Sequence, residues 1–365
     1  MKTIILMDVS GVAYQIINRL TGYGGKNIPK VIKAGRKYLE LESEQEEFLN
    51  QFHEELSKMS SIIAPLNVTD IFFVFDPLGE GSFRFGLYPE YKQTKTKKAD
   101  KPFCKQKFKY CMQRYHASLG ENGFNTLTQD RIEADDILYS CVQVIPEEYN
   151  ICIATMDGDM KQLLDDRTFL YNNITGVITT TENFRMDGRK EVQSLQEFKD
   201  DEDDEDKAML DIFETDFGVE DSYNKFFLNT TIVDARMSLL EKILTGDTSD
   251  NIPSCFKYKT KNGASEFGFT DKRFKVLAEE HDIDLSMLED DSKFKVLLEK
   301  MSLVVGRPLD ESRLEEYKQS MSFNIDLIDL SKSIKHHFYV AKLNLETAGN
   351  MNFSSLKFSN VNQEY

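Results

Sequence analysis

The chain has 365 residues, 40% of them hydrophobic, which is enough to bury a substantial core in one large domain or two smaller ones. Its five cysteines form no Cys-x-x-Cys pair, so the sequence indicates neither a zinc site nor a disulfide framework, and no apolar run approaches the length of a membrane span. The N-terminal apolar stretch stops at Asp8, too early for a signal peptide, and the formal net charge of −17 argues at first against nucleic acid as a partner. We therefore expect a cytoplasmic protein with no membrane partner.

Three short apolar runs in the first half of the chain have the character of buried parallel strands, because they are rich in β-branched and aromatic residues and bounded by polar ones. A carboxylate stands at or just past the C-terminal end of each run. The runs and their carboxylates are Thr3–Met7 with Asp8, Asp70–Phe75 with Asp76, and Asn150–Thr155 with Asp157.

Helical patterns separate these strands. The first opens with a Ser43/Glu46 capping box and runs to Ile63, and the others cover about 101–119 and 133–144. Strands that alternate with helices predict an α/β fold with a mostly parallel central sheet flanked by helices. Ligands of such a sheet bind outside the carboxyl ends of its strands, which is where the acids stand.

The second half of the chain is predicted to be mostly helical. A strand at 176–181 is followed by an acidic stretch at 199–221, which we expect to be mobile and solvated. An amphipathic helix at 233–244 then leads into the motif Gly-Asp-Thr-Ser-Asp-Asn-Ile-Pro. Further helices are expected near 271–280, 285–301 and 309–321.

Charge is distributed unevenly along the chain. Between Arg84 and Arg114 there are ten Lys or Arg residues and two acids, a local net charge of +8, whereas Asp200–Asp206 is a run of seven consecutive acids. The basic segment is either a charged helix in solvent or a surface that binds phosphates. Its one-sided composition favours phosphate binding.

The acids form a candidate metal-ion constellation drawn from five segments. Hard Mg²⁺ or Mn²⁺ ions prefer oxygen ligands, and two such ions about 4 Å apart can hold the attacking and leaving oxygens of a displacement at phosphorus. Glu133 and Asp136 share one face of a helix, and Gly158 permits a turn that aims its two neighbouring acids in the same direction. The full candidate set is Asp8, Asp76, Glu133, Asp135, Asp136, Asp157, Asp159, Asp247 and Asp250.

Each of these segments also has an ordinary structural explanation. An Asp after a strand is a common turn or helix-capping residue, the acids at 133–136 suit a helix N-terminus, and the motifs around Gly158 and Asp247 are compatible with plain turns. Five such segments together, in an order that brings strand ends to one edge of a sheet, favour the metal-site explanation.

The sequence resembles the 5′-nuclease family of flap endonucleases and 5′→3′ exonucleases, most closely its bacteriophage ribonuclease H branch. The resemblance covers about 2–180 and 233–253 and rests on five motifs that follow one another in the family's order. They are LMDVSG from Leu6, FDPLGEGSFRFGLYPEYKQ from Phe75, RIEADDILYSCV from Arg131, TMDGDMKQLL from Thr155 and KILTGDTSDNIP from Lys242.

The resemblance implies an enzyme that removes nucleotides, RNA primers or short flaps from 5′ ends with two or more Mg²⁺ ions, for which Mn²⁺ can substitute. It implies that the nine candidate acids are direct or water-mediated metal ligands, with Asp157 and Asp159 also among the catalytic residues. Arg84 and Lys92 match a basic pair that contacts the scissile phosphate at the base of a helical arch, which would span about 83–119. Further contacts to nucleic-acid phosphates are expected at Lys95, Lys97, Lys98, Lys257, Lys259, Lys272 and Arg273.

The chain departs from the family pattern in two places. The glycine-rich hairpin that follows the Asn-Ile-Pro motif in relatives, where it holds a potassium ion, has a different sequence here, and the stretch at 187–229 has no counterpart. We therefore expect a nuclease core with the arch at 1–186, a flexible acidic insertion at 187–229, and at 230–365 the rest of the metal site, a duplex-binding region and a helical C-terminal part.

The resulting hypothesis is a monomeric Mg²⁺-dependent 5′→3′ exonuclease and flap endonuclease with RNase H activity, acting on DNA and RNA·DNA hybrids in phage replication or repair, in the host cytoplasm. One alternative is a catalytically silent nucleic-acid-binding protein of the same fold, against which the complete set of acids argues. Another is a phosphatase that opens with strand-Asp-x-Asp, against which Ser10 argues. No motif in 343–365 selects between a single-strand-binding protein and a sliding clamp as a partner.

Overall fold

The computed structural model describes residues 2–22, 36–63, 66, 68–79, 81–93, 101–173, 175–185, 229–259 and 265–333. The chain folds as two compact units. The first comprises Met1–Gly79, Lys101–Val233 and Val340–Tyr365, and the second comprises Glu80–Asp100 and Asp234–Tyr339. Within the described ranges, no helix combines the length and the apolar character needed to cross a membrane.

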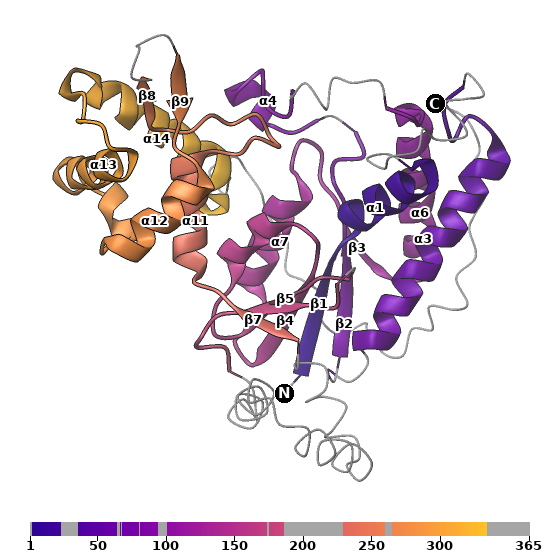
Figure 1. Ribbon diagram of the computed structural model, residues 1–365. Coiled ribbons are helices and arrows are strands. Elements are labelled where there is room, and N and C mark those ends of the chain that lie inside the picture. Colours follow the sequence, from indigo (N-terminus) through magenta and orange to yellow (C-terminus); the bar gives the residue numbers. More distant parts are fainter. Residues whose placement is uncertain are drawn as a thin grey trace, which may run out of the picture. The chain divides into compact units, whose positions relative to one another are not determined.

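The first unit is built around a sheet to which the described residues contribute seven strands (Figure 1). The strand order is β3-β2-β1-β4-β5-β6-β7, and all neighbouring pairs are parallel except β5 and β6. The expected mostly parallel α/β sheet is therefore confirmed. The strands are β1 (Lys2–Asp8), β2 (Val68–Val74), β3 (Asn125–Leu127), β4 (Tyr149–Ala154), β5 (Thr168–Tyr171), β6 (Ile178–Thr180) and β7 (Thr230–Ile232).

The order of the strands reverses between β1 and β4. From β1 the chain builds outward through β2 to β3 on one side, and it then returns to place β4 and β5 on the other side. In open α/β sheets such a switch point leaves a crevice at the carboxyl ends of the two central strands, because the connections on either side leave in opposite directions. The candidate acids Asp8 and Asp157 follow the two strands that form this switch point.

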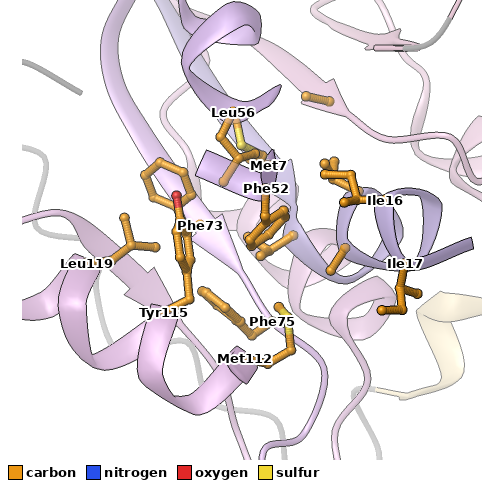
Figure 2. Close-up of a cluster of buried hydrophobic side chains, with 14 of the residues drawn as sticks. Met7, Ile16, Ile17, Phe52, Leu56, Phe73, Phe75, Met112, Tyr115 and Leu119 are labelled. Atoms are coloured by element: carbon orange, nitrogen blue, oxygen red, sulfur yellow. The ribbon is translucent and has the colours of Figure 1, made fainter. Parts of the chain in front are cut away.

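Three helices cover one face of the sheet: α1 (Val9–Thr21), α3 (Glu42–Ile63) and α6 (Lys105–Glu121). Figure 2 shows their apolar side chains meeting those of β1 and the end of β2, with Met7 and Phe73 close to Ile16, Phe52 and Tyr115. All five side chains are buried. Successive strand residues point to opposite faces, so this packing accounts for every second residue of the strands.

The remaining strand residues face the other side of the sheet. Ile4, Leu6 and Val74 are buried but lie outside the cluster of Figure 2, and helix α7 (Ala134–Val144) packs against β1 and β2. Both faces of the central strands are therefore covered. This explains why their sequences read as continuous apolar runs rather than alternating ones.

The second unit is mostly helical, as expected. Its core is formed by apolar side chains such as Leu240, Phe274, Leu297 and Tyr317. Residues 80–100, which the sequence placed with the nuclease core, belong to this unit by their contacts. Its elements are α4 (Arg84–Leu87), α11 (Ala235–Thr245), β8 (Lys257–Lys259), β9 (Glu266–Gly268), α12 (Asp271–Glu280), η3 (Leu285–Leu288), α13 (Asp291–Val305), η4 (Glu311–Arg313), α14 (Leu314–Ile328) and α15 (Leu330–Ser333).

Asp70 is a buried carboxylate inside β2, away from the acids that follow the strands. Its exposed fraction is 4%, and among the described residues its Oδ1 has no hydrogen-bond partner. Burial raises the pKa of Asp70 to about 6, from an ordinary value of 3.8. The folded chain therefore holds a proton on Asp70 at pH values where the unfolded chain has already lost it.

We expect Asp70→Asn to stabilise the protein near neutral pH and to have little effect near pH 4. The raised pKa makes the free energy of unfolding fall as pH rises through the window from 3.8 to about 6, and the loss persists above it. The amide carries no charge at either pH, so we expect a gain in Tm of roughly 3 °C at neutral pH. Thermal melts at both pH values measure the effect, with Asp166→Asn, at an exposed position, as the control. An equal gain at both pH values would contradict the assignment to charge.

Candidate active site

Asp8 lies at the end of β1 and caps α1. Its Oδ1 accepts a hydrogen bond from the Gly11 amide at 3.0 Å, and its Oδ2 accepts one from the Thr155 hydroxyl at 2.9 Å. A Cβ at Gly11 would lie only 2.7 Å from Oδ2, so glycine lets the helix backbone approach the carboxylate. Burial raises the pKa of Asp8 to about 6 against the hydrogen bond from Gly11, and the charges of Asp76 and Asp157 raise it further. Asp76 and Asp157 are thus close enough to Asp8 for their charges to repel its carboxylate.

Asp76 follows β2 and reaches the N-terminus of α7. Its Oδ1 accepts a hydrogen bond from the Ala134 amide at 3.1 Å, and its own amide donates to the Ser10 hydroxyl at 3.1 Å. At the same helix end, Asp136 Oδ2 accepts from the Glu133 amide at 3.3 Å. Glu133 and Asp136 are buried, and Asp135 is half-buried. The structure therefore brings the acids at 133–136 next to Asp76, and their role as metal ligands stays a prediction.

Asp157 follows β4 and caps the short helix η2 (Gly158–Leu163). Its Oδ1 accepts from the Asp159 amide at 2.9 Å, and its own amide donates to the Thr155 hydroxyl at 3.0 Å. The Thr155 side chain therefore joins Asp8 to Asp157 across the switch point. The sequence did not single out this threonine. Its signal was present, because it is the last residue of an apolar run that ends beside an acid.

The side-chain oxygens of these residues are suitable ligands for a hard divalent cation. They are carboxylate and hydroxyl oxygens, and the charges of Asp76 and Asp157 act on the buried Asp8, where a cation would relieve the repulsion. As they stand in the described ranges, however, no group of three or more His, Cys, Asp or Glu side chains is placed to hold a metal ion. The carboxylates of Asp8, Asp76, Asp136 and Asp157 instead accept hydrogen bonds from amides or a hydroxyl, so their oxygens would have to draw together around an ion.

Asp247 and Asp250 lie in the second unit, in the loop after α11. Asp247 Oδ1 accepts from the amides of Ser249 at 2.6 Å and Asp250 at 3.2 Å, and its Oδ2 pairs with Lys242 Nζ at 2.8 Å. Burial acts to raise the pKa of Asp247, but the hydrogen bonds from Lys242 and Ser249 outweigh it and hold the pKa at about 2. Asp247 is therefore charged at every physiological pH, and Lys242 is a partner that the sequence did not predict.

Lys92 and its neighbours are held against the same loop by hydrogen bonds. The Lys92 amide donates to the Asp250 carbonyl at 2.8 Å, and the Tyr91 hydroxyl donates to Asp250 Oδ2 at 3.0 Å, from which Lys92 Nζ lies 3.9 Å away. Asn251 completes the contact, since its side-chain amide donates to the Glu90 carbonyl at 3.0 Å. Within this unit the structure thus joins the Tyr-Lys motif to the Asp-Asn motif, although about 160 residues separate them along the chain.

The backbone at this contact is strained. Lys92 has a φ of 54° and Asn251 a φ of 63°, in the left-handed region that side chains with a Cβ rarely adopt. Asn tolerates this region better than most residues, whereas Lys does not. A strained residue held in place by hydrogen bonds on both sides is typical of a functional position.

Arg84 occupies a different environment from the one expected. Only 3% of it is exposed, and its Nε donates to the carbonyl of Leu327 at the end of α14 at 3.0 Å. The guanidinium also lies over the Phe83 ring, 4.8 Å from its centroid. A buried cation at the C-terminal end of a helix is stabilised by the helix dipole, so this structure gives Arg84 a role in holding the unit together. Its contact with a scissile phosphate stays a prediction.

The predicted arch is not one element. Residues 105–119 belong to α6, whose side chains Phe108, Met112 and Tyr115 are buried against the sheet of the first unit, and Arg114 is buried in an ion pair with Glu46 at 2.7 Å. The basic residues of α6 therefore alternate with an apolar face that packs on the sheet, and the arch at about 83–119 stays a prediction. Lys95, Lys97 and Lys98 and the whole of 187–228 lie outside the described residues.

The remaining basic candidates lie on or near the β8–β9 hairpin, which stands where the sequence departs from the family pattern. Lys259 and Lys272 are exposed and Lys257 is half-buried. Arg273 donates to the Tyr258 hydroxyl and lies over its ring, 4.9 Å from the centroid. Phosphate binding by these four residues stays a prediction.

Comparisons with known proteins show that the chain is similar to 5′-3′ exonucleases. Residues 33–194 match the family model of the 5′-3′ exonuclease, N-terminal resolvase-like domain. The 5′-3′ exonuclease of Mycoplasmopsis pulmonis (strain UAB CTIP) is 28% identical over 139 residues, 38% of this chain. The match spans 44% of that protein, less than half of its length.

Two solved structures from bacteriophage T5 share the fold. The flap endonuclease in a pseudo-enzyme-product complex with DNA and metal ions has a TM-score of 0.50 and 14% identity, over 91% of this chain and 90% of its own. The 5′-exonuclease with bound zinc has a TM-score of 0.51 and 16% identity, over 91% of each chain. At such low identity the likeness shows the fold alone.

Proposed function

We propose that this chain is a member of the 5′-nuclease family and a divalent-metal-dependent nuclease that cuts phosphodiester bonds near the 5′ ends of nucleic acids. The observation that carries the proposal is the gathering of Asp8, Asp76 and Asp157 at the switch point of a parallel sheet. Such a concentration of negative charge would repel a phosphate, so a nucleic-acid substrate requires cations between the acids and the phosphodiester.

The residues of the chain have distinct roles in this proposal. Asp8, Asp76, Glu133, Asp135, Asp136, Asp157 and Asp159 would hold the metal ions, with Asp247 and Asp250 as further ligands. When bound, the ions supply Lewis-acid stabilisation of the phosphoryl group and a nucleophilic water at neutral pH. The hydroxyls of Ser10 and Thr155 hold Asp76 and Asp157 in position, because they accept hydrogen bonds from the backbone amides of these two aspartates. Lys92 provides positive charge for the phosphoryl oxygens as negative charge builds up on them.

The finer assignments of the proposal follow the resemblance to the phage branch of the family. We propose Mg²⁺ as the physiological ion, with RNase H activity on RNA·DNA hybrids and cleavage of 5′ flaps during phage DNA replication or repair. The substrates would be DNA and RNA·DNA hybrids with free 5′ ends, bound by a monomer in the host cytoplasm. The T5 flap endonuclease, crystallised with DNA and metal ions, supports this class of substrate.

Cleavage should begin at free 5′ ends. We expect streptavidin bound to a 5′-biotin before the enzyme is added to slow the cutting of a 5′ flap strongly, because a metal site alone does not set direction and polarity must come from how the strand is admitted. The same adduct on the 3′ end should have little effect. The assay uses purified protein with Mg²⁺ on a labelled 5′-flap, a nicked duplex and an RNA·DNA hybrid.

The controls separate the parts of the proposal. Addition of EDTA should stop all cleavage, and an uncut hybrid beside a cut flap would remove the RNase H assignment alone. Equal inhibition by both adducts, or rapid digestion from 3′ ends, would retain a metal-dependent nuclease but contradict its 5′ polarity.

A further inference from the structure

Lys242 has a position that the proposed function leaves unexplained. It lies on α11, five residues before Asp247, and its ammonium is 2.8 Å from Asp247 Oδ2. The carboxylate is nearly buried, with 7% of its side chain exposed, whereas 38% of the Lys242 side chain is exposed. The amine can therefore move into solvent, but the carboxylate cannot follow it.

The hydrogen bonds of Asp247 leave little room for another cation. Its Oδ1 already accepts from the amides of Ser249 and Asp250, and its Oδ2 accepts from Lys242. A divalent ion that bound Oδ2 directly would lie about 2.1 Å from that oxygen. It would then compete for the same oxygen as the ammonium, and the two positive charges would repel each other.

The other acid of this loop is partnered differently. Asp250 Oδ2 accepts from the neutral Tyr91 hydroxyl at 3.0 Å, and Lys92 Nζ lies 3.9 Å from the same oxygen. An ion pair that only stabilises the loop after α11 would have the same geometry at Asp247 as a lysine that competes with metal ions. A measurement of metal binding is therefore needed to separate these two explanations.

We propose that Lys242 competes with divalent metal ions for Asp247. The lysine thereby weakens ion binding at this carboxylate and keeps the loop after α11 folded when no ion is bound. The proposal rests on the proposed function, because it takes Asp247 to be a metal ligand. Lys242 is then a positioning residue. It sets the metal concentration at which the Asp247 carboxylate exchanges the Lys242 ammonium for a divalent ion.

Binding of Mn²⁺ alone to the full-length protein, after dialysis against EDTA, tests the proposal. Electron paramagnetic resonance of free Mn²⁺ gives the affinities without any substrate. We expect Lys242→Gln to tighten the weakest class of sites about tenfold, because the apparent affinity rises when the competing state is removed. Lys242→Arg, which keeps the charge, should bind Mn²⁺ as the wild type does. Arg236→Gln removes a positive charge from the exposed side of the same helix and should also change nothing.

A second measurement covers the case in which Lys242→Gln folds poorly. The proposal predicts that this variant melts below the wild type in EDTA and that saturating Mn²⁺ restores its Tm, because the ion then takes over the role of the ammonium. Unchanged or weaker Mn²⁺ binding by Lys242→Gln, or a loss of Tm that Mn²⁺ does not restore, would overturn the proposal. Absence of Mn²⁺ binding by the wild type itself would instead contradict the proposed function.

Discussion

Asp8→Asn is expected to reduce turnover strongly while leaving the metal-free protein as stable as the wild type or more stable. The amide oxygen can still accept from Gly11, and Asn caps helices as well as Asp does, so α1 keeps its N-cap. The charge is lost, however, and with it the repulsion from Asp76 and Asp157 and the energetic cost of burying a carboxylate. Loss of a metal-binding carboxylate should reduce turnover by about 10³-fold.

Two measurements reveal these opposite effects. Single-turnover cleavage of a 5′-flap in Mg²⁺ reports the catalytic loss, and melts with and without Mg²⁺ report the stability. In the wild type, ion binding to the folded state should raise Tm, and Asp8→Asn should lose most of that increment. Asp70→Asn is the matched control, because it removes a buried carboxylate from the neighbouring strand and should keep full turnover. Near-wild-type cleavage by Asp8→Asn would exclude Asp8 from the site.

The ordinary structural explanation of the acids is observed at two positions, and it leaves the metal-site prediction open. Asp8 and Asp157 cap the helices that follow their strands, as the ordinary explanation predicted. Capping occupies one oxygen of each carboxylate with an amide and leaves the other for a hydroxyl or an ion. A parallel strand that leads directly into a helix therefore offers the same residue as both cap and ligand, which is why local patterns alone could not separate the two explanations.

The strands of the switch point could be predicted because both of their faces are buried, which leaves a continuous apolar run ending in an acid. Helix α1 was missed although its pattern is present: Val9, Val12, Ala13, Ile16 and Ile17 are buried at helical spacing directly after Asp8. The run of β1 merges into this pattern without a turn residue between them. The boundary is set by the capping contact of Asp8, which sequence periodicity does not record.

Basic residues were the least predictable part of the site. Arg84 and Arg114 contribute to the net charge of the segment as Lys92 does, yet both are buried against a carbonyl or a carboxylate, and Lys92 is not. Whether a cation faces phosphate or protein depends on partners distant in the chain, such as Leu327 and Glu46. Lys242 shows the converse case, a residue inside a recognised motif whose partner is evident only from the fold of the loop.

Replacing Lys92 is expected to separate catalysis from stability. Lys92→Met keeps the left-handed backbone strain and removes the charge, whereas Lys92→Gly removes both. Relief of a left-handed Cβ is worth about 1–2 kcal/mol. The entropy of the unfolded glycine chain offsets about 0.5–1 kcal/mol of that gain. Lys92→Gly should therefore be more stable than Lys92→Met by about 0.5–1 kcal/mol, while both should lose about 10²-fold in turnover.

Urea denaturation in EDTA compares the two variants without any contribution from bound ions, and single-turnover cleavage in Mg²⁺ compares their chemistry. Both variants lose the ammonium near Asp250, so any change in the pairing of that carboxylate cancels between them. The difference in stability then reports relief of the backbone at φ 54°, less the unfolded-chain entropy of glycine. If Lys92→Gly were the less stable of the two, the conformation at this position would be relaxed rather than strained. If Lys92→Met cleaved the flap at the wild-type rate, the ammonium would have no part in phosphate binding. A more stable but inactive Lys92→Gly would show two things. The contact between residues 90–92 and 250–251 holds a strained backbone in place, and this backbone positions the positive charge that turnover requires.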